Sequence, residues 1–266
     1  MSTRFIIFSL ARCGSNNLVN LLRCHPDIRI IAEPFNREIF EGKYFSRSLD
    51  AESLDSILEE IWGTWNGIKH VWDSWGWPFG RHSELNKHLL SRRDVHIIFL
   101  TRKNDLQRVV SKEICRQTNI WYAASEHDKR TIFEFSFKPL DSQSIESELA
   151  RDKKCIAEYR QLLKDNHLKL LELSYEDLCD STIPLERRLD KLDEVVTWLG
   201  RTSIRDEANL EEVRNLLEHD NSDVRSHSIY PMIPGIEEVE RNLGSDETGW
   251  LFKGQAAGDM GAPIVA

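Results

Sequence analysis

The stretch FIIFSLARCGSNNLVNLLRCHPDIRIIAEPF, residues 5–35, decides the fold. Phe5–Leu10 is apolar and too short for a helical period, so we predict a buried strand that stops at a turn containing Gly14. Leucines at three- and four-residue spacing then predict a helix over about residues 15–24. A strand, a glycine turn and a helix start form an anion-binding cradle, because the first N–H groups of a helix lack intrahelical partners. An ordinary turn, in which the glycine only relieves strain, is the alternative.

The cradle lacks the features of a loop that binds nucleoside triphosphates with magnesium. That loop has the pattern GxxxxGK[ST], in which a lysine reaches the outer phosphates and a hydroxyl holds the metal. In this chain the basic residue, Arg12, precedes Gly14, and neither a Gly-Lys pair after the turn nor a metal-holding carboxylate can be identified. We therefore expect a shorter anionic group that needs no metal. Its expected ligands are Arg12, Cys13, Gly14, Ser15, Asn16 and Asn17.

A carboxylate is expected beside this cradle. Residues 28–32 predict a second strand, and Glu33 follows at its end. In open parallel sheets, ligands bind beyond the carboxyl ends of the strands, so Glu33 should emerge on the same edge as Arg12. There it could remove a proton from an alcohol or amine that accepts a transferred group. A surface glutamate that caps a loop is the alternative.

The order Arg-x-Gly-Ser after a first strand resembles the phosphosulfate-binding loop of sulfotransferases. The resemblance extends through LLRCHPDIRIIAEPF, residues 21–35, which is similar to tyrosylprotein and bacterial carbohydrate sulfotransferases. SYEDL, residues 174–178, is similar to a strand-to-helix signature of the same family. The resemblance implies a P-loop-like nucleotide-binding fold and sulfuryl transfer from 3′-phosphoadenosine 5′-phosphosulfate (PAPS). It also implies that Glu33 is the general base and that Arg12 holds the phosphosulfate.

A second anionic group is expected at another strand end. Residues 95–101 give the clearest buried strand, Arg102 follows it, and Ser111 lies on the helix predicted next. TRKNDLQRVVS, residues 101–111, resembles the 3′-phosphate site of sulfotransferases, most closely the bacterial branch of trehalose and nodulation-factor sulfotransferases. The resemblance implies that Arg102 and Ser111 clamp the 3′-phosphate. An ion pair between Arg102 and Asp105 is the alternative.

Five of the eight tryptophans lie in WGTWNGIKHVWDSWGWPF, residues 62–79. Within it, residues 67–72 predict a strand that is similar to a Gly-x-Lys strand of bacterial sulfotransferases. Its Lys69 could neutralise the transferred sulfuryl group, and its His70 is either an alternative base or a structural histidine. Flat indole rings suit a sugar acceptor, whereas internal packing is the alternative. We expect the acceptor to be a hydroxyl of a glycan or glycoconjugate, contacted by Phe35, Lys69, His70 and Trp75.

The whole pattern predicts an α/β fold with a central parallel sheet flanked by helices. We expect a single domain over residues 1–253 and a flexible tail over residues 254–266. The phenylalanines at 133, 135 and 137 alternate, which indicates an edge strand or an acceptor-binding loop. Helical spacing indicates helices near residues 51–62, 85–90, 105–119, 145–166, 187–199 and 236–243, and residues 168–173 indicate a further strand. The long helix at 145–166 is expected to cover the sheet or to form a homodimer.

The amino-acid composition limits the binding partners and the cellular location that we expect for this protein. The chain has 266 residues and a formal net charge of −9, which argues against nucleic acid as the main partner. Five cysteines without a C-x-x-C pair, and no recognisable secretory leader or membrane-spanning run, predict a cytoplasmic protein with reduced thiols and no metal site. Two alternatives remain open. They are a small-molecule kinase, which would require magnesium and ATP, and a non-catalytic phosphoadenosine-binding protein.

Overall fold

The computed structural model describes residues 3–47, 49–123, 125–166, 169–218 and 226–252. The predicted tail over 254–266 lies outside these residues. The chain divides into two compact units, and the single-domain organisation therefore stays a prediction. The first unit comprises Met1–Lys103 and Ala150–Ser222, and the second comprises Asn104–Leu149 and Asp223–Ala266.

A five-stranded parallel sheet forms the centre of the first unit, as predicted. Its strands are β1 (Phe5–Leu10), β2 (Ile30–Ala32), β3 (Gly67–Trp72), β4 (His96–Thr101) and β5 (Lys169–Ser174). They are arranged in the order β2-β3-β1-β4-β5. The central strand β1 is buried along its whole length, and five of its six residues are apolar, as expected where helices cover both faces of a parallel sheet.

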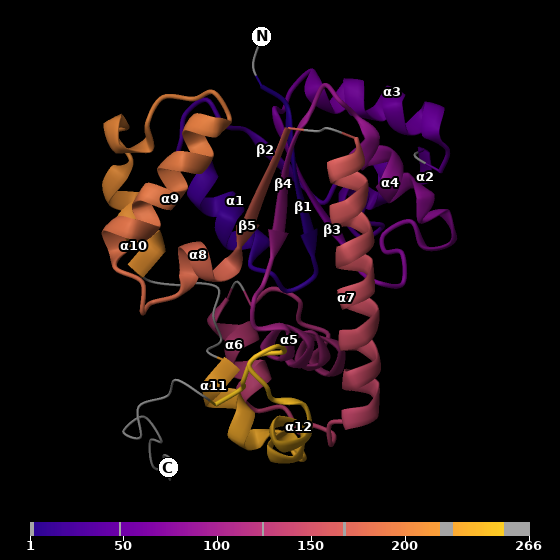
Figure 1. The fold of residues 1–266 in the computed structure, drawn as a ribbon, viewed down its shortest axis with the longest axis vertical. Coiled ribbons are helices and arrows are strands. Elements are labelled where there is room, and N and C mark those ends of the chain that lie inside the picture. Colours follow the sequence, from indigo (N-terminus) through magenta and orange to yellow (C-terminus); the bar gives the residue numbers. More distant parts are fainter. Residues whose placement is uncertain (1–2, 48, 124, 167–168, 219–225, 253–266) are drawn as a thin grey trace. The chain divides into compact units, whose positions relative to one another are not determined.

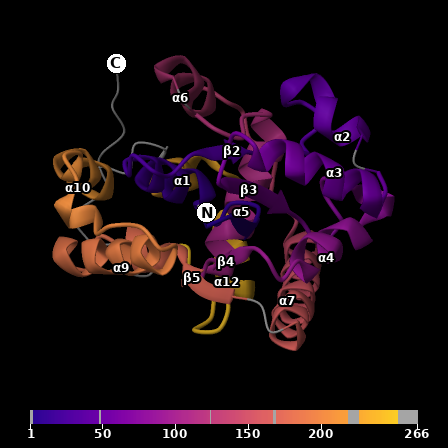
Figure 2. The same ribbon diagram turned by 90° about the horizontal axis from the view of Figure 1, so that it is seen from above.

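Helices cover both faces of this sheet, and the side on which the chain leaves the sheet changes between β1 and its neighbour β3. One face carries α1 (Ser15–Arg23), α9 (Leu185–Trp198) and α10 (Leu210–Glu218), and the other carries α3 (Ala51–Trp62), α4 (Glu84–Ser91) and the last two-thirds of α7 (Ser142–Asp165) (Figures 1 and 2). The chain therefore leaves β1 toward one face and leaves its neighbour β3 toward the other. Ligands of open α/β sheets bind at such a switch point, beyond the carboxyl ends of the strands.

Aromatic side chains join the sheet to α7 within the first unit. Phe8 of β1 lies beside Trp72 of β3, with ring centroids 5.5 Å apart. Tyr159 of α7 contacts both rings edge-on, at 5.1 Å from Phe8 and 4.7 Å from Trp72. Trp72 is thus a core residue, and the packing alternative for the tryptophan cluster holds at this position.

The second unit is helical and has a hydrophobic core of its own. It contains α5 (Asp105–Thr118), α6 (Glu126–Phe133), the start of α7, α11 (Ser226–Ile229) and α12 (Ile236–Leu243). Val109 and Val110 of α5 share this core with Tyr230 and Val239. The helix α6 ends at Phe133, and the residues that follow form no strand, so the edge-strand interpretation of the alternating phenylalanines is wrong.

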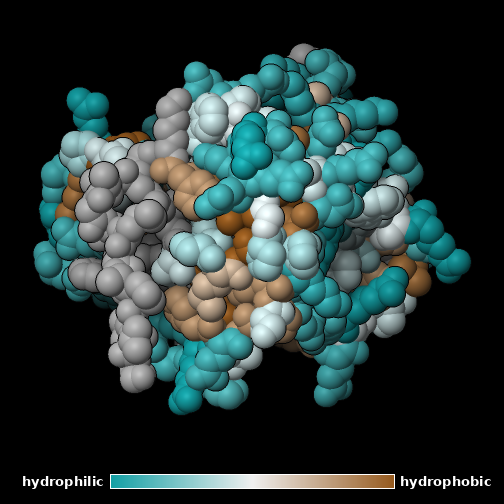
Figure 3. Space-filling model, turned by 90° about the horizontal axis from the view of Figure 1, so that it is seen from below, coloured by the Kyte–Doolittle hydropathy of each residue, from teal (hydrophilic) through white to brown (hydrophobic). Residues whose placement is uncertain are grey.

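Among the described residues, no helix combines the length and the apolar composition that crossing a bilayer requires. The face seen in Figure 3 is mostly hydrophilic, with apolar side chains gathered in a smaller area.

Candidate functional site

The candidate site lies in the first unit, where successive strands end. Arg12 follows β1, Glu33 follows β2 directly, and Arg102 follows β4 directly. Because these strands are parallel and β1 pairs with both β3 and β4, their ends meet along one edge of the sheet. The predicted convergence of Arg12, Glu33 and Arg102 on one edge is therefore present.

The turn between β1 and α1 has the backbone of an anion cradle. Gly14 is the N-cap of α1 and has φ 75° and ψ 24°, the left-handed conformation that glycine adopts without strain. The cap has no side-chain hydrogen bond, so the first N–H groups of α1, at Ser15–Asn17, have no side-chain cap from this position and no partner within the helix. Cys13 and Ser15 are buried.

Tyr175 closes one side of the cradle. It is the first residue of α8 (Tyr175–Cys179), directly after β5. A Cβ atom on Gly14 would lie 2.8 Å from Cε2 of Tyr175 and closer still to its Cδ2, so only glycine fits under this ring. The Arg102 guanidinium lies 4.6 Å from the centroid of the same ring, and its Nη1 donates to the Arg12 carbonyl oxygen at 3.5 Å. Arg102 is thus held against the cradle rather than apart from it.

Lys69 connects the carboxylate to the start of α1. Its ammonium lies 2.6 Å from Oε1 of Glu33 and also donates a hydrogen bond to Oδ1 of Asn16. The Lys69 side chain is only 3% exposed, whereas that of Glu33 is 22% exposed. A buried ammonium must be paired, and here its partners come from the two segments that border the anion cradle and the expected base. Asn36 completes the arrangement by donating to Oε2 of Glu33 at 3.1 Å.

Two residues of the site have an unusual backbone. Five non-glycine residues among those described have a positive φ, and two of them are Arg12, at 68°, and Glu33, at 48°. A left-handed conformation at such a residue costs on the order of 1–3 kcal/mol and persists where the surroundings impose it, most often at functional sites. This strain therefore coincides with both residues that the sequence analysis expects to be catalytic.

The structure places three of the four expected acceptor contacts, Phe35, Lys69 and His70, in the interior. Phe35 is fully buried, and His70 is only 1% exposed. The His70 ring stacks on Phe8 and Phe79, and its Nε2 donates to Oδ1 of Asn86 at 2.7 Å. These contacts favour the structural role for His70 and a packing role for Phe35, since neither presents surface to a ligand. Burial lowers the pKa of His70 to about 4, against a smaller opposing effect of its hydrogen bond with Asn86.

The neutral His70 should make stability depend on pH. The unfolded chain takes up a proton at His70 below pH 6.5, whereas the folded chain resists protonation until about pH 4. The contribution of the neutral His70 to the free energy of unfolding is therefore fully present above pH 6.5. It decreases as the pH falls from 6.5 toward about 4. We expect the free energy of unfolding to drop by about 2 kcal/mol from this residue between about pH 7.5 and about pH 5. Denaturant unfolding of the wild type and of His70→Gln would measure it, and an equal pH dependence in both proteins would contradict it.

The remaining expected residues lie in different settings. Trp75 is exposed and follows β3 at the same edge of the sheet. Asn17 lies in the first turn of α1 and donates from Nδ2 to the Cys179 sulfur at 3.8 Å. Ser111 is buried on α5, in the second unit, and its joint action with Arg102 stays a prediction. The hydrogen bond from Asn36 to Glu33 was not predicted, because only the tertiary fold brings the Asn36 amide to the carboxylate.

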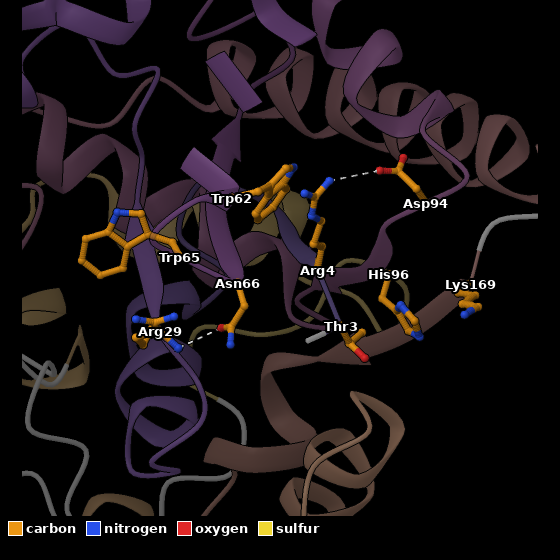
Figure 4. A pocket seen from close by; sticks show the side chains of 9 residues that line it. All are labelled: Thr3, Arg4, Arg29, Trp62, Trp65, Asn66, Asp94, His96 and Lys169. Atoms are coloured by element: carbon orange, nitrogen blue, oxygen red, sulfur yellow. Dashed lines mark hydrogen bonds and ion pairs between the residues drawn. The ribbon is translucent and has the colours of Figure 1, made fainter. Parts of the chain in front are cut away.

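A cavity of about 500 Å³ lies at the other edge of the sheet, where the strands begin (Figure 4). Its lining includes Arg4, Arg29, Trp62 and Asp94. Arg4 is already paired with Glu59 at 3.0 Å and lies 3.8 Å from Asp94. Ligands of parallel sheets bind at the opposite, carboxyl edge, so we do not assign the functional site to this cavity.

Comparisons with known proteins add no assignment to this geometry. The chain matches no model of a protein family, and no curated protein sequence matches it significantly.

Proposed function

We propose that this protein is a sulfotransferase that moves a sulfuryl group from PAPS to a hydroxyl of a glycan or glycoconjugate. The observation that carries the proposal is the link from Glu33 through Lys69 to Asn16, which joins a carboxylate to an anion cradle at the switch point of the sheet. This combination supplies the two requirements of the reaction. One is a base for the acceptor, and the other is a set of cations and N–H groups for the donor.

The donor fits the charge and position of the basic residues. PAPS carries a 5′-phosphosulfate and a 3′-phosphate on one ribose, so the groups that hold them must lie close together. Arg12 and the N–H groups at the start of α1 suit the phosphosulfate, and Arg102, held against the Arg12 carbonyl, suits the 3′-phosphate. Arg12, Lys69 and Arg102 supply three formal positive charges beside the single carboxylate of Glu33.

The proposed reaction is an in-line transfer of the sulfuryl group. Glu33 removes the proton of the acceptor hydroxyl as its oxygen forms a bond to sulfur. The bond between sulfur and the bridging oxygen of the 5′-phosphate breaks, and its electron pair stays on the leaving 3′,5′-diphosphoadenosine. Arg12 and the amides of α1 stabilise the charge that grows on this phosphate, and Lys69 neutralises the sulfuryl oxygens.

Nucleotide binding tests the donor assignment directly. A ligand at about 100 times its dissociation constant stabilises a protein by about 2.7 kcal/mol. We expect 3′,5′-diphosphoadenosine to raise the melting temperature more than AMP or ATP at equal concentration, without magnesium. Stabilisation by ATP that is strengthened by magnesium would instead support the kinase alternative.

Arg102→Ala tests the position of the 3′-phosphate. Because a charge-assisted hydrogen bond is worth about 1.5–3 kcal/mol, the variant should bind 3′,5′-diphosphoadenosine roughly ten- to a hundred-fold more weakly while its affinity for AMP changes little. Isothermal titration calorimetry with both nucleotides would measure the difference. Lys103→Ala is the matched control, since it removes an adjacent charge whose side chain is 66% exposed and pairs with Asp177. Equal weakening of both nucleotides in Arg102→Ala would count against the assignment.

A further inference from the structure

The loop after β3 is held in one conformation by hydrogen bonds. Oδ1 of Asp73 accepts from the backbone N–H of Trp75 at 2.8 Å and of Trp77 at 3.0 Å. Asn86 of α4 donates to the carbonyl of Trp77 at 3.3 Å and is itself bonded to the buried His70. The exposed Trp75 side chain is therefore carried by a backbone that is tied to the core.

Trp75 and Arg151 form a pair on the surface of the first unit. Trp75 is 64% exposed, the largest value among the exposed large hydrophobic side chains described. The guanidinium carbon of Arg151, on α7, lies 4.4 Å from the centroid of the indole, a cation–π distance. The Nε of Arg151 is buried and has no hydrogen-bond partner among the described residues, where Arg151 also forms no ion pair. The guanidinium thus lies over one face of the indole, and among the described residues no carboxylate pairs with it.

The acidic groups nearest in sequence do not take this role. Asp73 lies in the same loop, and its Oδ1 is used by the loop amides. Asp152 follows Arg151 on the helix but is only 1% exposed. Arg151 therefore remains suited to an anionic group that arrives from outside.

From this geometry we propose that Trp75 and Arg151 form an acceptor subsite for a sugar residue that carries a carboxylate. The inference rests on the proposed function, because it names the acceptor of the same reaction. The exposed part of the indole that Arg151 leaves uncovered offers a flat surface to the C–H groups of a sugar ring, and the guanidinium presents a fork that matches a carboxylate with two parallel hydrogen bonds. The loop that carries Trp75 follows β3, between the end of β2, which carries Glu33, and the end of β1, which carries the cradle. A sugar on Trp75 therefore lies beside the edge where the transfer takes place, and the acceptor is an acidic glycan.

The test compares acidic and neutral oligosaccharides in two measurements. The acidic probe is a hexasaccharide of alternating glucuronic acid and N-acetylgalactosamine, and the neutral probe is the same compound with its carboxylates reduced to alcohols. Binding is measured by calorimetry on the full chain, with 3′,5′-diphosphoadenosine present and absent, and transfer is measured with a sulfur-labelled donor. The variants are Arg151→Gln and Trp75→Ala, and the control is Lys154→Gln on the same helix, whose side chain is 79% exposed.

We expect Arg151→Gln to weaken binding of the acidic probe at least ten-fold and to leave the neutral probe unchanged. Trp75→Ala should weaken both probes, and Lys154→Gln should weaken neither. Equal effects of Arg151→Gln on the two probes, a wild-type preference for the neutral probe, or no glycan binding at all would overturn the inference. Failure of the proposed function would appear differently, as no binding of 3′,5′-diphosphoadenosine and no transfer to any acceptor. In that case the calorimetric comparison of the two probes still decides whether the subsite exists.

Discussion

Replacing Glu33 with glutamine is expected to reduce the rate of sulfuryl transfer by about 10²- to 10⁴-fold, the range in which a positioned general base acts. Glutamine keeps the shape of the side chain, and its carbonyl oxygen can accept from Lys69, whereas its NH2 group takes the place of Oε2 and gives up the hydrogen bond from Asn36. What it removes is the negative charge that takes the acceptor proton. The nucleotide cradle, built from other residues, should therefore keep most of its affinity for 3′,5′-diphosphoadenosine. The rate is measured by single-turnover transfer of labelled sulfate, and the affinity by calorimetry.

Glu38→Gln is the matched control for this prediction. It makes the same chemical change five residues along the same segment, at an exposed position. The control should transfer sulfate at the wild-type rate. Wild-type turnover in Glu33→Gln would reject Glu33 as the base, and a parallel loss of nucleotide binding would indicate that the carboxylate instead organises the cradle through Lys69.

Gly14→Ala is expected to be the most destabilising single-methyl change at the site. The new Cβ would lie 2.8 Å from Cε2 of the Tyr175 ring, and the residue would have to keep a φ of 75°. A left-handed alanine costs about 1–2 kcal/mol, and an overpacked contact about 1–3 kcal/mol more. We therefore expect the free energy of unfolding to fall by about 2–5 kcal/mol, with loss of 3′,5′-diphosphoadenosine binding. Denaturant unfolding and calorimetry measure the two effects.

Two further variants separate the causes of this loss. Gly80 also has a positive φ, of 56°, but a Cβ there would meet no atom within 4 Å, so Gly80→Ala reports the backbone cost alone. The double variant Gly14→Ala with Tyr175→Ala removes the clash and keeps the backbone strain. If Gly14→Ala and Gly80→Ala destabilise the protein equally, the close approach of the Tyr175 ring to the turn contributes nothing.

The first and last residues were predicted correctly for the strands and helices that have the strongest local sequence pattern. The strands β1 and β3 and the helices α3 and α12 begin and end at the predicted residues. The two strands were identified by their short length and the turn residues beside them, and the two helices by a regular apolar stripe. The convergence of Arg12, Glu33 and Arg102 also followed from the sequence, since parallel strands bring their carboxyl ends together.

One weak local signal was missed, and features that depend on tertiary contacts could not be predicted. The helix α6 is short and polar, and its start is marked by a capping box between Ser125 and Asp128 that competed with the more conspicuous phenylalanine alternation. The depth at which His70 lies follows from the stacking of aromatic rings contributed by separate segments. The double contact of Lys69 with Glu33 and Asn16 likewise requires the relative position of β3, β2 and α1, which no local pattern encodes.

The ion pair between Lys69 and Glu33 would affect the order in which two substrates bind. As long as Lys69 neutralises this carboxylate, an alcohol that arrives alone meets a base whose charge is already engaged. In the proposed transfer, the sulfate-bearing nucleotide would offer the same cation a competing anion and free the carboxylate. For that reaction we therefore expect the nucleotide to bind before the alcohol.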